Sequence, residues 1–288
     1  MTLSKDLPRG VAGLLGAGFR GKPSRMRYLV RMASLGAVLG AGFAMAAFLA
    51  IEPIEAHSRN ALALSVDSCV IATRTLHVPF PCLAVDLAGG KGDGYAVIRP
   101  PLGRSEVLLV PTTPITGIES PALLRADAPP LFQDAWAARR YVVATLPRDP
   151  GRTALGMAVN SRPSRSQDRL HIHVDCLRPR VVAALARLGP RIGDSWTRVP
   201  LPLFGGRYWA RQVSASSFET MNPFKLMHDG LPLARQSMAD MTLVIAGTTL
   251  PNGRPGFMLL AANTRGRGLE RAVGEDLLDH ACRLANAG

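Results

Sequence analysis

Residues 160–179 read NSRPSRSQDRLHIHVDCLRP, an arginine- and serine-rich loop followed by alternating polar and apolar residues. In a β-strand, side chains at alternate positions share one face. His171, His173 and Asp175 are therefore expected to project together. Their apolar neighbours would pack the other way: Leu170, Ile172, Val174 and Cys176. This pattern predicts a strand that presents two imidazoles and a carboxylate to one side of a sheet.

Short apolar runs and helical periodicities on both sides of this strand predict the other elements. Further strands are expected over residues 94–99, 106–110, 155–160, 241–247 and 256–261, the last two as a hairpin across a Pro-Asn-Gly turn. Helices are expected over residues 60–76, 131–146, 180–188 and 270–286. Residues 111–121, rich in proline and threonine, are expected to form a rigid loop. Because strands and helices do not alternate strictly, the predicted fold class is α+β.

The N-terminal segment differs from the rest of the chain in hydropathy and charge. Residues 32–51 are 20 residues without a charge, and a helix of about 20 apolar residues can cross a bilayer. Four cations between positions 22 and 31 precede this span, so the positive-inside rule places residues 1–31 in the cytoplasm. The alternative is a cleaved signal peptide, but its apolar core usually has about 7–15 residues. We therefore expect a basic N-terminus (1–31), a transmembrane anchor (32–51) and an exported domain (52–288).

The formal net charge of +13 is spread over the whole chain. Residues 1–51 carry seven Lys or Arg and one acid, or +6, which leaves +7 for residues 52–288. A basic domain is attracted to anionic lipid surfaces and to substrates that carry phosphate. We do not expect nucleic acid as a partner, because the arginines are scattered, aromatic residues are only 6% and the domain is predicted to be exported.

All four cysteines follow the predicted anchor, and an even number in an exported domain indicates disulfides. Cys69 and Cys82 flank a short loop that contains proline, so we expect them to pair. This pairing leaves Cys176, beside the histidines, for Cys282 near the C-terminus. The sequence has no C-x-x-C spacing that would indicate a structural metal site.

Imidazoles next to arginines suit chemistry at phosphorus. An unperturbed imidazole has a pKa of about 6.5, so it is largely neutral and nucleophilic near neutral pH. Two other interpretations are open at this point. The histidines can be polar strand residues without a catalytic role. Alternatively, His171, His173 and Asp175 can bind a metal, with a fourth ligand from His77, His228 or His280.

Several motifs in this sequence resemble a known superfamily. Residues 160–175 resemble the active-site strand of the histidine-triad (HIT) nucleotide hydrolases and transferases, in which H-x-H-x-H-x-x follows a loop with a glutamine. Two more segments, LLVPTTPITGIESP at 108–121 and MNPFKL at 221–226, resemble one branch, the membrane-bound CDP-diacylglycerol pyrophosphatases. The resemblance covers residues 60–285 and extends to the predicted anchor and the four cysteines. It implies a HIT-like antiparallel sheet with flanking helices, preceded by one N-terminal transmembrane helix.

The resemblance also implies roles for individual residues. Counted from Gln167, the superfamily spacing places the nucleophile at His173 and the first triad member at His171. Asp175 then takes the third position, where the superfamily has a histidine. In the alternative register, His171 is the nucleophile, His173 the third member and Arg169 a replaced first member. We prefer His173, because Gln167 and Asn160 then fall where the superfamily has them.

The implied activity is hydrolysis of the pyrophosphate of CDP-diacylglycerol to CMP and phosphatidate, without a metal or another cofactor. His173 would form a covalent cytidylyl-histidine, and His171 would support the ring or the leaving group. The loop before the strand would bind the substrate through Asn160, Ser161, Arg162, Arg165 and Ser166. Gln167 would stabilise the charge on the phosphoryl oxygens in the transition state. The enzyme would lie in the bacterial inner membrane, with its catalytic domain on the periplasmic side.

Alternatives to this activity follow from the same residues. One is a metal-dependent phosphoesterase that uses the histidine strand, and another is a non-catalytic envelope protein that binds anionic lipid. A water-soluble nucleotide pyrophosphate is an alternative substrate. The arginine-rich loop can also be a solvated basic surface, and Glu119 with its neighbouring hydroxyls can either line the site or belong to a rigid loop. The sequence indicates no particular oligomeric state.

Overall fold

The computed structural model describes residues 52–87, 94–101, 104–200, 202–203, 205–265 and 272–286. The chain divides into two compact units, Met1–Glu55 and Ala56–Gly288, and the fold described below is that of the second unit. The predicted N-terminal segments, residues 1–31 and 32–51, lie outside the described residues, so these domain limits stay a prediction.

The predicted fold class needs a correction at the N-terminus. Among the residues that the structure describes, no helix is both long enough and apolar enough to cross a bilayer. The longest of these helices, α2 (Glu52–Leu76), carries five charged residues among its 25. The predicted fold is therefore corrected for the described residues, which form an α+β domain without a membrane-spanning helix, and the predicted span, residues 32–51, lies outside them.

One antiparallel sheet forms the centre of the domain and agrees with the predicted α+β class. Its nine strands have the order β1-β2-β3-β5-β4-β8-β9-β7-β6. In chain order, they are Ala84–Asp86, Tyr95–Ile98, Val107–Pro111, Leu155–Val159, Ile172–Cys176, Thr197–Arg198, Trp209–Ser214, Met241–Thr249 and Pro255–Asn263. The predicted hairpin is the pair β8–β9, with a register that runs from Met241↔Asn263 to Thr249↔Pro255.

Helices cover both faces of the sheet. The α-helices after α2 are α3 (Leu131–Val143), α4 (Pro179–Leu188), α5 (Ala215–Thr220), α6 (Pro223–Gly230), α7 (Pro232–Gln236) and α8 (Arg283–Asn286). Short 3-10 helices are η1 (Pro121–Leu124), η2 (Arg152–Ala154), η3 (Gly189–Arg191), η4 (Met238–Asp240) and η6 (Glu275–Leu277). A proline opens α4, α6 and α7, where its fixed φ suits the first turn and its missing N–H costs nothing.

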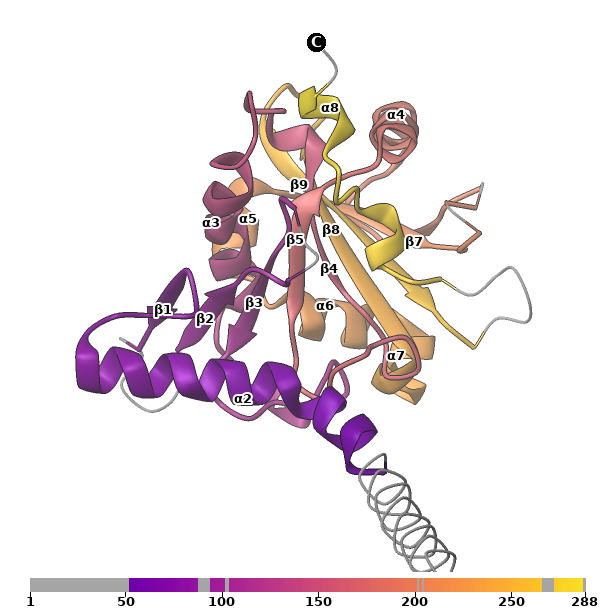
Figure 1. The fold of residues 1–288 in the computed structure, drawn as a ribbon. Helices are drawn as coiled ribbons and strands as arrows, with labels where there is room; N and C mark the ends of the chain where they lie inside the picture. The colour runs from indigo at the N-terminus through magenta and orange to yellow at the C-terminus, as the bar shows by residue number, and fades with distance from the viewer. Residues whose placement is uncertain are drawn as a thin grey trace, which may run out of the picture. The chain divides into compact units, whose positions relative to one another are not determined.

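The alternation of side chains along the strands produces separate apolar layers. On one face, Ile172 and Val174 of β5 belong to the main core, which includes residues of α3, α5, α6 and α7. On the other face, Val181 and Leu185 of α4 pack with Val244 and Leu260. Figure 1 shows α3 and α5 on one side of the sheet and α4 on the other. A third cluster joins α2 to β2 and β3. Burial of each large aliphatic side chain stabilises the fold by about 1.5–3 kcal/mol.

The C-terminal segment differs from the predicted helix over residues 270–286. Among its described residues, only Glu275–Leu277 (η6) and Arg283–Asn286 (α8) are helical. Between them, Leu278 pairs with Leu177 in a β-bridge, and the backbone N–H of Asp279 donates to the carbonyl of Cys176 at 2.7 Å. These bonds to the end of β5 replace the intrahelical bonds, so tertiary contacts override the local helical periodicity.

Candidate active site

The predicted histidine face lies at the centre of the sheet. His173 is opposite Leu108 of β3 and Ala158 of β4, and only 6% of it is exposed. The rings of His171 and His173 meet edge to face, with centroids 4.9 Å apart. The structure therefore brings the two histidines together, while Ile172 and Val174 enter the core on the other face.

A buried carboxylate fixes the orientation of His173. Its Nδ1 lies 2.6 Å from Oε1 of Glu106, the residue immediately before β3. Because a carboxylate only accepts hydrogen bonds, Nδ1 carries the hydrogen in the neutral ring and Nε2 carries the lone pair. Nε2 is buried and has no hydrogen-bond partner. A ring held in this way has one nitrogen available for chemistry.

His280 and Asp175 form a second pair of imidazole and carboxylate beside the first. His280 Nδ1 lies 2.9 Å from Asp175 Oδ2, and Asp175 Oδ1 accepts hydrogen bonds from Ser105 Oγ at 2.7 Å and from the N–H of Cys176 at 2.8 Å. The hydrogen bonds to Asp175 and Glu275 raise the pKa of His280 to about 10. His280 is therefore a cation at neutral pH.

Glu275 connects the two imidazoles. Its Oε2 lies 3.5 Å from His173 Nε2, and its Oε1 lies 3.6 Å from His280 Nε2. Asn160, at the end of β4, donates from Nδ2 to Oε2 at 2.9 Å and accepts from the N–H of Glu275 at 3.2 Å. The hydrogen bond from His280, together with a weaker one from Asn160, lowers the pKa of Glu275 to about 2.

Gly274 allows the segment that carries Glu275 to approach the sheet. A Cβ atom at this position would lie 2.5 Å from Thr242 Oγ1 and 3.1 Å from Val244 Cγ2. A larger residue would push the segment outward, and with it the next residue, Glu275. The close packing of this glycine therefore helps to place the carboxylate between the imidazoles.

His171 is held in a different way from His173. Its Nδ1 donates to the carbonyl of Arg169 at 2.7 Å. Burial, and then the neighbouring His173, lowers the pKa of His171 to about 4, so the ring is neutral at physiological pH. The guanidinium of Arg169 is itself bound to the carbonyls of Pro111 and Thr112.

The predicted loop residues are not all placed with the histidines. Asn160 is part of the cluster, but Gln167 Oε1 accepts from the N–H of Leu62 in α2 at 2.9 Å. Arg165 is buried and forms ion pairs with Glu119 at 2.7 Å and with Asp168 at 3.1 Å. The remaining predicted residues of this loop are a buried Ser161 and the exposed Arg162 and Ser166.

Four residues of the cluster were not predicted for this role: Ser105, Glu106, Glu275 and His280. His280 was considered only as a fourth metal ligand. Glu106 had a weak signal in the sequence, because an acid stands directly before the buried apolar run VLLV. Glu275 lies in a segment that was predicted as a helix, and nothing in its local sequence indicates a contact with β5.

Glu106, His173 and Glu275 also form a group whose potential ligand atoms lie within 4.8 Å of one another. This set differs from the predicted metal alternative, which used His171 and Asp175. Glu106 Oε1 already accepts the hydrogen bond from His173 Nδ1. The arrangement therefore fits a hydrogen-bonded imidazole better than a bound cation.

Both predicted disulfides are present, as Cys69–Cys82 and Cys176–Cys282. The first joins α2 to the loop before β1. The second joins β5 to the segment that carries His280, two residues before Cys282. Cys176 also directly follows Asp175, so this bridge ties together the backbones of both members of the Asp175–His280 pair.

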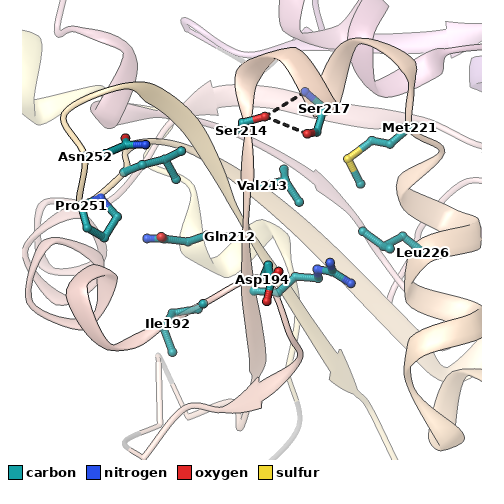
Figure 2. A pocket seen from close by; sticks show the side chains of 13 residues that line it. Ile192, Asp194, Gln212, Val213, Ser214, Ser217, Met221, Leu226, Pro251 and Asn252 are labelled. Carbon is teal, nitrogen blue, oxygen red and sulfur yellow. Dashed lines mark hydrogen bonds between the residues drawn. The ribbon is translucent and has the colours of Figure 1, made fainter.

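A cavity of about 610 Å³ lies away from this cluster, along β7 and the tip of the β8–β9 hairpin. Figure 2 shows Gln212 and Pro251 on one side of it and Met221 and Leu226 on the other. None of its lining residues belongs to the histidine strand. We assign no role to it.

In this cluster one nitrogen of a buried imidazole is fixed by a carboxylate, and a second imidazole lies beside it as a cation. Enzymes with a nucleophilic or acid-base histidine use arrangements of this kind. Residues 57–286 match the family model for CDP-diacylglycerol pyrophosphatase. The chain is also 38% identical over 216 residues to the CDP-diacylglycerol pyrophosphatase of Yersinia pestis, an alignment that covers 75% of this chain and 81% of that protein.

The chain therefore belongs to the CDP-diacylglycerol pyrophosphatase family, and it is a hydrolase. The predicted resemblance to CDP-diacylglycerol pyrophosphatases is confirmed, and the wider resemblance to the histidine-triad superfamily stays a prediction.

Proposed function

We propose that this protein hydrolyses CDP-diacylglycerol to CMP and phosphatidate, and that His173 is the nucleophile. Family membership supports the substrate. The choice of nucleophile rests on one geometric observation. His173 Nδ1 is hydrogen-bonded to Glu106, while His173 Nε2 has no hydrogen-bond partner and faces the polar cluster. His171, by contrast, is held by a backbone carbonyl and is kept neutral by burial.

In the first step, His173 Nε2 forms a bond to the phosphorus that bears cytidine. The bond from this phosphorus to the bridging oxygen breaks, and phosphatidate leaves with that electron pair. The phosphorylated ring is then an imidazolium, and Glu106 on Nδ1 balances its charge. His171 packs against the ring and limits its rotation.

In the second step, water attacks the same phosphorus. The bond between phosphorus and Nε2 breaks, CMP leaves, and one proton of the water passes to the solvent. The imidazole of His173 returns to its neutral state. The scheme is the one that the resemblance to the histidine-triad enzymes implies, with Asp175 in the position of the third histidine. Arg162 and Ser166 remain the candidates for contact with the nucleotide from the exposed part of the loop.

The enzyme acts, on this proposal, at a lipid surface outside the cytoplasm. Two disulfides suit an oxidising compartment. The exposed large hydrophobic side chains of the described residues all lie between positions 64 and 83: Leu64, Ile71, Leu76, Val78, Phe80 and Leu83. We call this group the α2 apolar surface. Apolar side chains of this kind on a basic domain suit contact with anionic lipid.

The alternative, a metal-dependent phosphoesterase, has one observation in its favour, which is the short separation of Glu106, His173 and Glu275. Addition of EDTA to the purified enzyme separates the two functions. Covalent histidine catalysis predicts unchanged release of CMP, and loss of activity that a divalent cation restores would favour the alternative.

Substitution of His173 tests the proposed function. His173→Ala should lower CMP release from CDP-diacylglycerol in vesicles by at least about 100-fold, because the nucleophile is removed. His228→Ala is the matched control, since it removes a histidine of α6 outside the cluster and should leave CMP release unchanged. Activity of His173→Ala equal to that of the wild type would refute the proposal.

A further inference from the structure

We propose that the Glu275 carboxylate occupies the place of the phosphoryl group that His173 attacks, and that His280 binds this group once Glu275 moves aside. The inference rests on the proposed function and adds an anion-binding residue to it. His280 would be a catalytic residue in direct contact with the substrate, and Asp175 would be its positioning residue.

The contacts of Glu275 are those expected of a bound phosphoryl group. One carboxylate oxygen lies 3.5 Å from His173 Nε2, and the other lies 3.6 Å from His280 Nε2. The amide of Asn160 donates to the first oxygen at 2.9 Å. A reacting phosphorus must come within about 3–3.5 Å of its nucleophile, so substrate and carboxylate compete for the same space.

Solvent exposure indicates which side chain gives way. The carboxylates of Glu106 and Asp175 are 8% and 0% exposed, and both hold imidazoles from inside the domain. The side chains of Glu275 and His280 are 35% and 38% exposed. These two side chains are the open part of a cluster in which His173 Nε2 is itself buried.

Charge gives a second reason for Glu275 to leave. Carboxylates surround His280 on three elements: Asp175 on β5 at 2.9 Å, Glu275 on η6 at 3.6 Å and Glu106 before β3 at 3.7 Å. The nearby acid Asp279 is paired with Arg283. A pyrophosphate dianion would be repelled by three carboxylates around one cation. Replacement of Glu275 by the phosphoryl group keeps an anion next to both imidazoles without adding another charge.

His280 is anchored so that it stays in place when Glu275 moves. Asp175 holds Nδ1, which directs Nε2 toward the shared anion position. The backbone is fixed on both sides of His280 by the N–H of Asp279, which donates to Cys176, and by the Cys176–Cys282 disulfide. In the reaction, the N–H at Nε2 donates to a phosphoryl oxygen whose negative charge grows in the transition state. No proton has to leave His280.

The binding of CMP, the nucleotide product, tests this proposal without requiring turnover. Isothermal titration calorimetry would compare the wild type with Glu275→Gln and His280→Gln. Glu275→Gln removes the competing charge and should tighten CMP binding by at least tenfold. His280→Gln removes the cation and should weaken CMP binding by at least tenfold.

Matched controls are Glu219→Gln and His228→Gln. Glu219 is exposed, and His228 is also paired with an aspartate. Both controls should bind CMP as the wild type does.

Three results would overturn the inference: no binding of CMP to the wild type, unchanged or weaker binding to Glu275→Gln, or wild-type affinity in His280→Gln. If His280→Gln does not fold, Glu275→Gln still tests the exchange, because it keeps the shape of a partly exposed side chain. Failure of the proposed function would be seen separately, as activity on CDP-diacylglycerol that does not depend on His173.

Discussion

The hydrogen bond between His173 and Glu106 makes the two nitrogens of the His173 ring different from each other. A free imidazole exchanges its proton between two nitrogens. Here a buried carboxylate at 2.6 Å keeps the proton on Nδ1 and leaves the lone pair on Nε2. His171, two residues earlier, has a carbonyl in the same position and a lowered pKa. His173 on β5 and His171 just before it therefore differ because their partners differ.

Glu106→Gln tests the role of the carboxylate. The amide is nearly isosteric, but it cannot balance the positive charge of the phosphorylated ring, and its NH2 group can favour the wrong tautomer. We expect kcat to fall by about 100-fold or more with little change in KM, measured as CMP release. A variant with wild-type kcat would mean that the orientation of His173 does not depend on Glu106.

The lowered pKa of His171 predicts how stability depends on pH. The unfolded chain takes up the proton near pH 6.5, and the folded chain only near pH 4. The free energy of unfolding should therefore fall as pH falls from about 6.5 to 4, by roughly 3 kcal/mol from this residue. Urea unfolding of the wild type and of His171→Asn measures the difference, and the variant should lack this part of the pH dependence. Parallel curves for the two proteins would contradict the assignment.

The strand β5 shows which features of an element can be predicted from its sequence. Its polar and apolar residues alternate with the period of a β-strand. In a segment this short, a strand is the conformation that buries every apolar side chain on one face. The pairing of β8 with β9 was predictable for the same reason, together with the turn between them. Apart from Asn160, the polar groups that reach this strand from elsewhere in the chain come from the residues before β3 and from the C-terminal segment.

The C-terminal segment could not be predicted in the same way. Its residues have helical periodicity, yet most of the described part runs beside the end of β5. The disulfide to Cys176, the bridge between Leu177 and Leu278, and the bond between Asp175 and His280 hold it there. These contacts join positions about a hundred residues apart in the sequence, so no local pattern indicates them. The disulfide was predicted, but its consequence for His280 was not.

Removal of the disulfides tests the role of this segment. The bridges close sequence separations of 13 and 106 residues, and each should stabilise the fold by about 2–5 kcal/mol. We expect both double variants, Cys69→Ser/Cys82→Ser and Cys176→Ser/Cys282→Ser, to unfold at lower temperature. Only the second should lose activity at temperatures where both are folded, because it frees the segment of His280. An equal effect of both pairs on kcat would show that the second bridge has no part in positioning His280.

At the scale of the whole molecule, the relevant feature is where the histidine strand, α2 and the α2 apolar surface lie in the domain. The sheet places the histidine strand between β3 and β4, and α2 packs across β2 and β3. Among the described residues, the most exposed large hydrophobic side chain is Phe80 of the α2 apolar surface, at 76%. Composition predicted a basic domain that meets anionic lipid. It could not identify this surface, because the exposure of an apolar residue depends on the packing of the finished fold.

Substitution of Leu64, Ile71 and Phe80 by serine tests this surface. The triple variant should cleave CDP-diacylglycerol in anionic vesicles at least about tenfold more slowly, because less apolar area is available to enter the bilayer. Its activity on a monomeric short-chain CDP-diacylglycerol should equal that of the wild type, which makes this substrate the control for intact chemistry. Equal loss on both substrates would point to damage of the fold, and no loss on vesicles would exclude the surface as a lipid contact.

The central claim is that His173 becomes covalently linked to the nucleotide during turnover. Rapid mixing of enzyme with CDP-diacylglycerol, quenching without acid and peptide mass spectrometry across residues 170–177 test it directly. We predict a cytidylyl adduct on His173 that disappears as CMP is released. An adduct on His171, or turnover without an adduct on either histidine, would contradict the account.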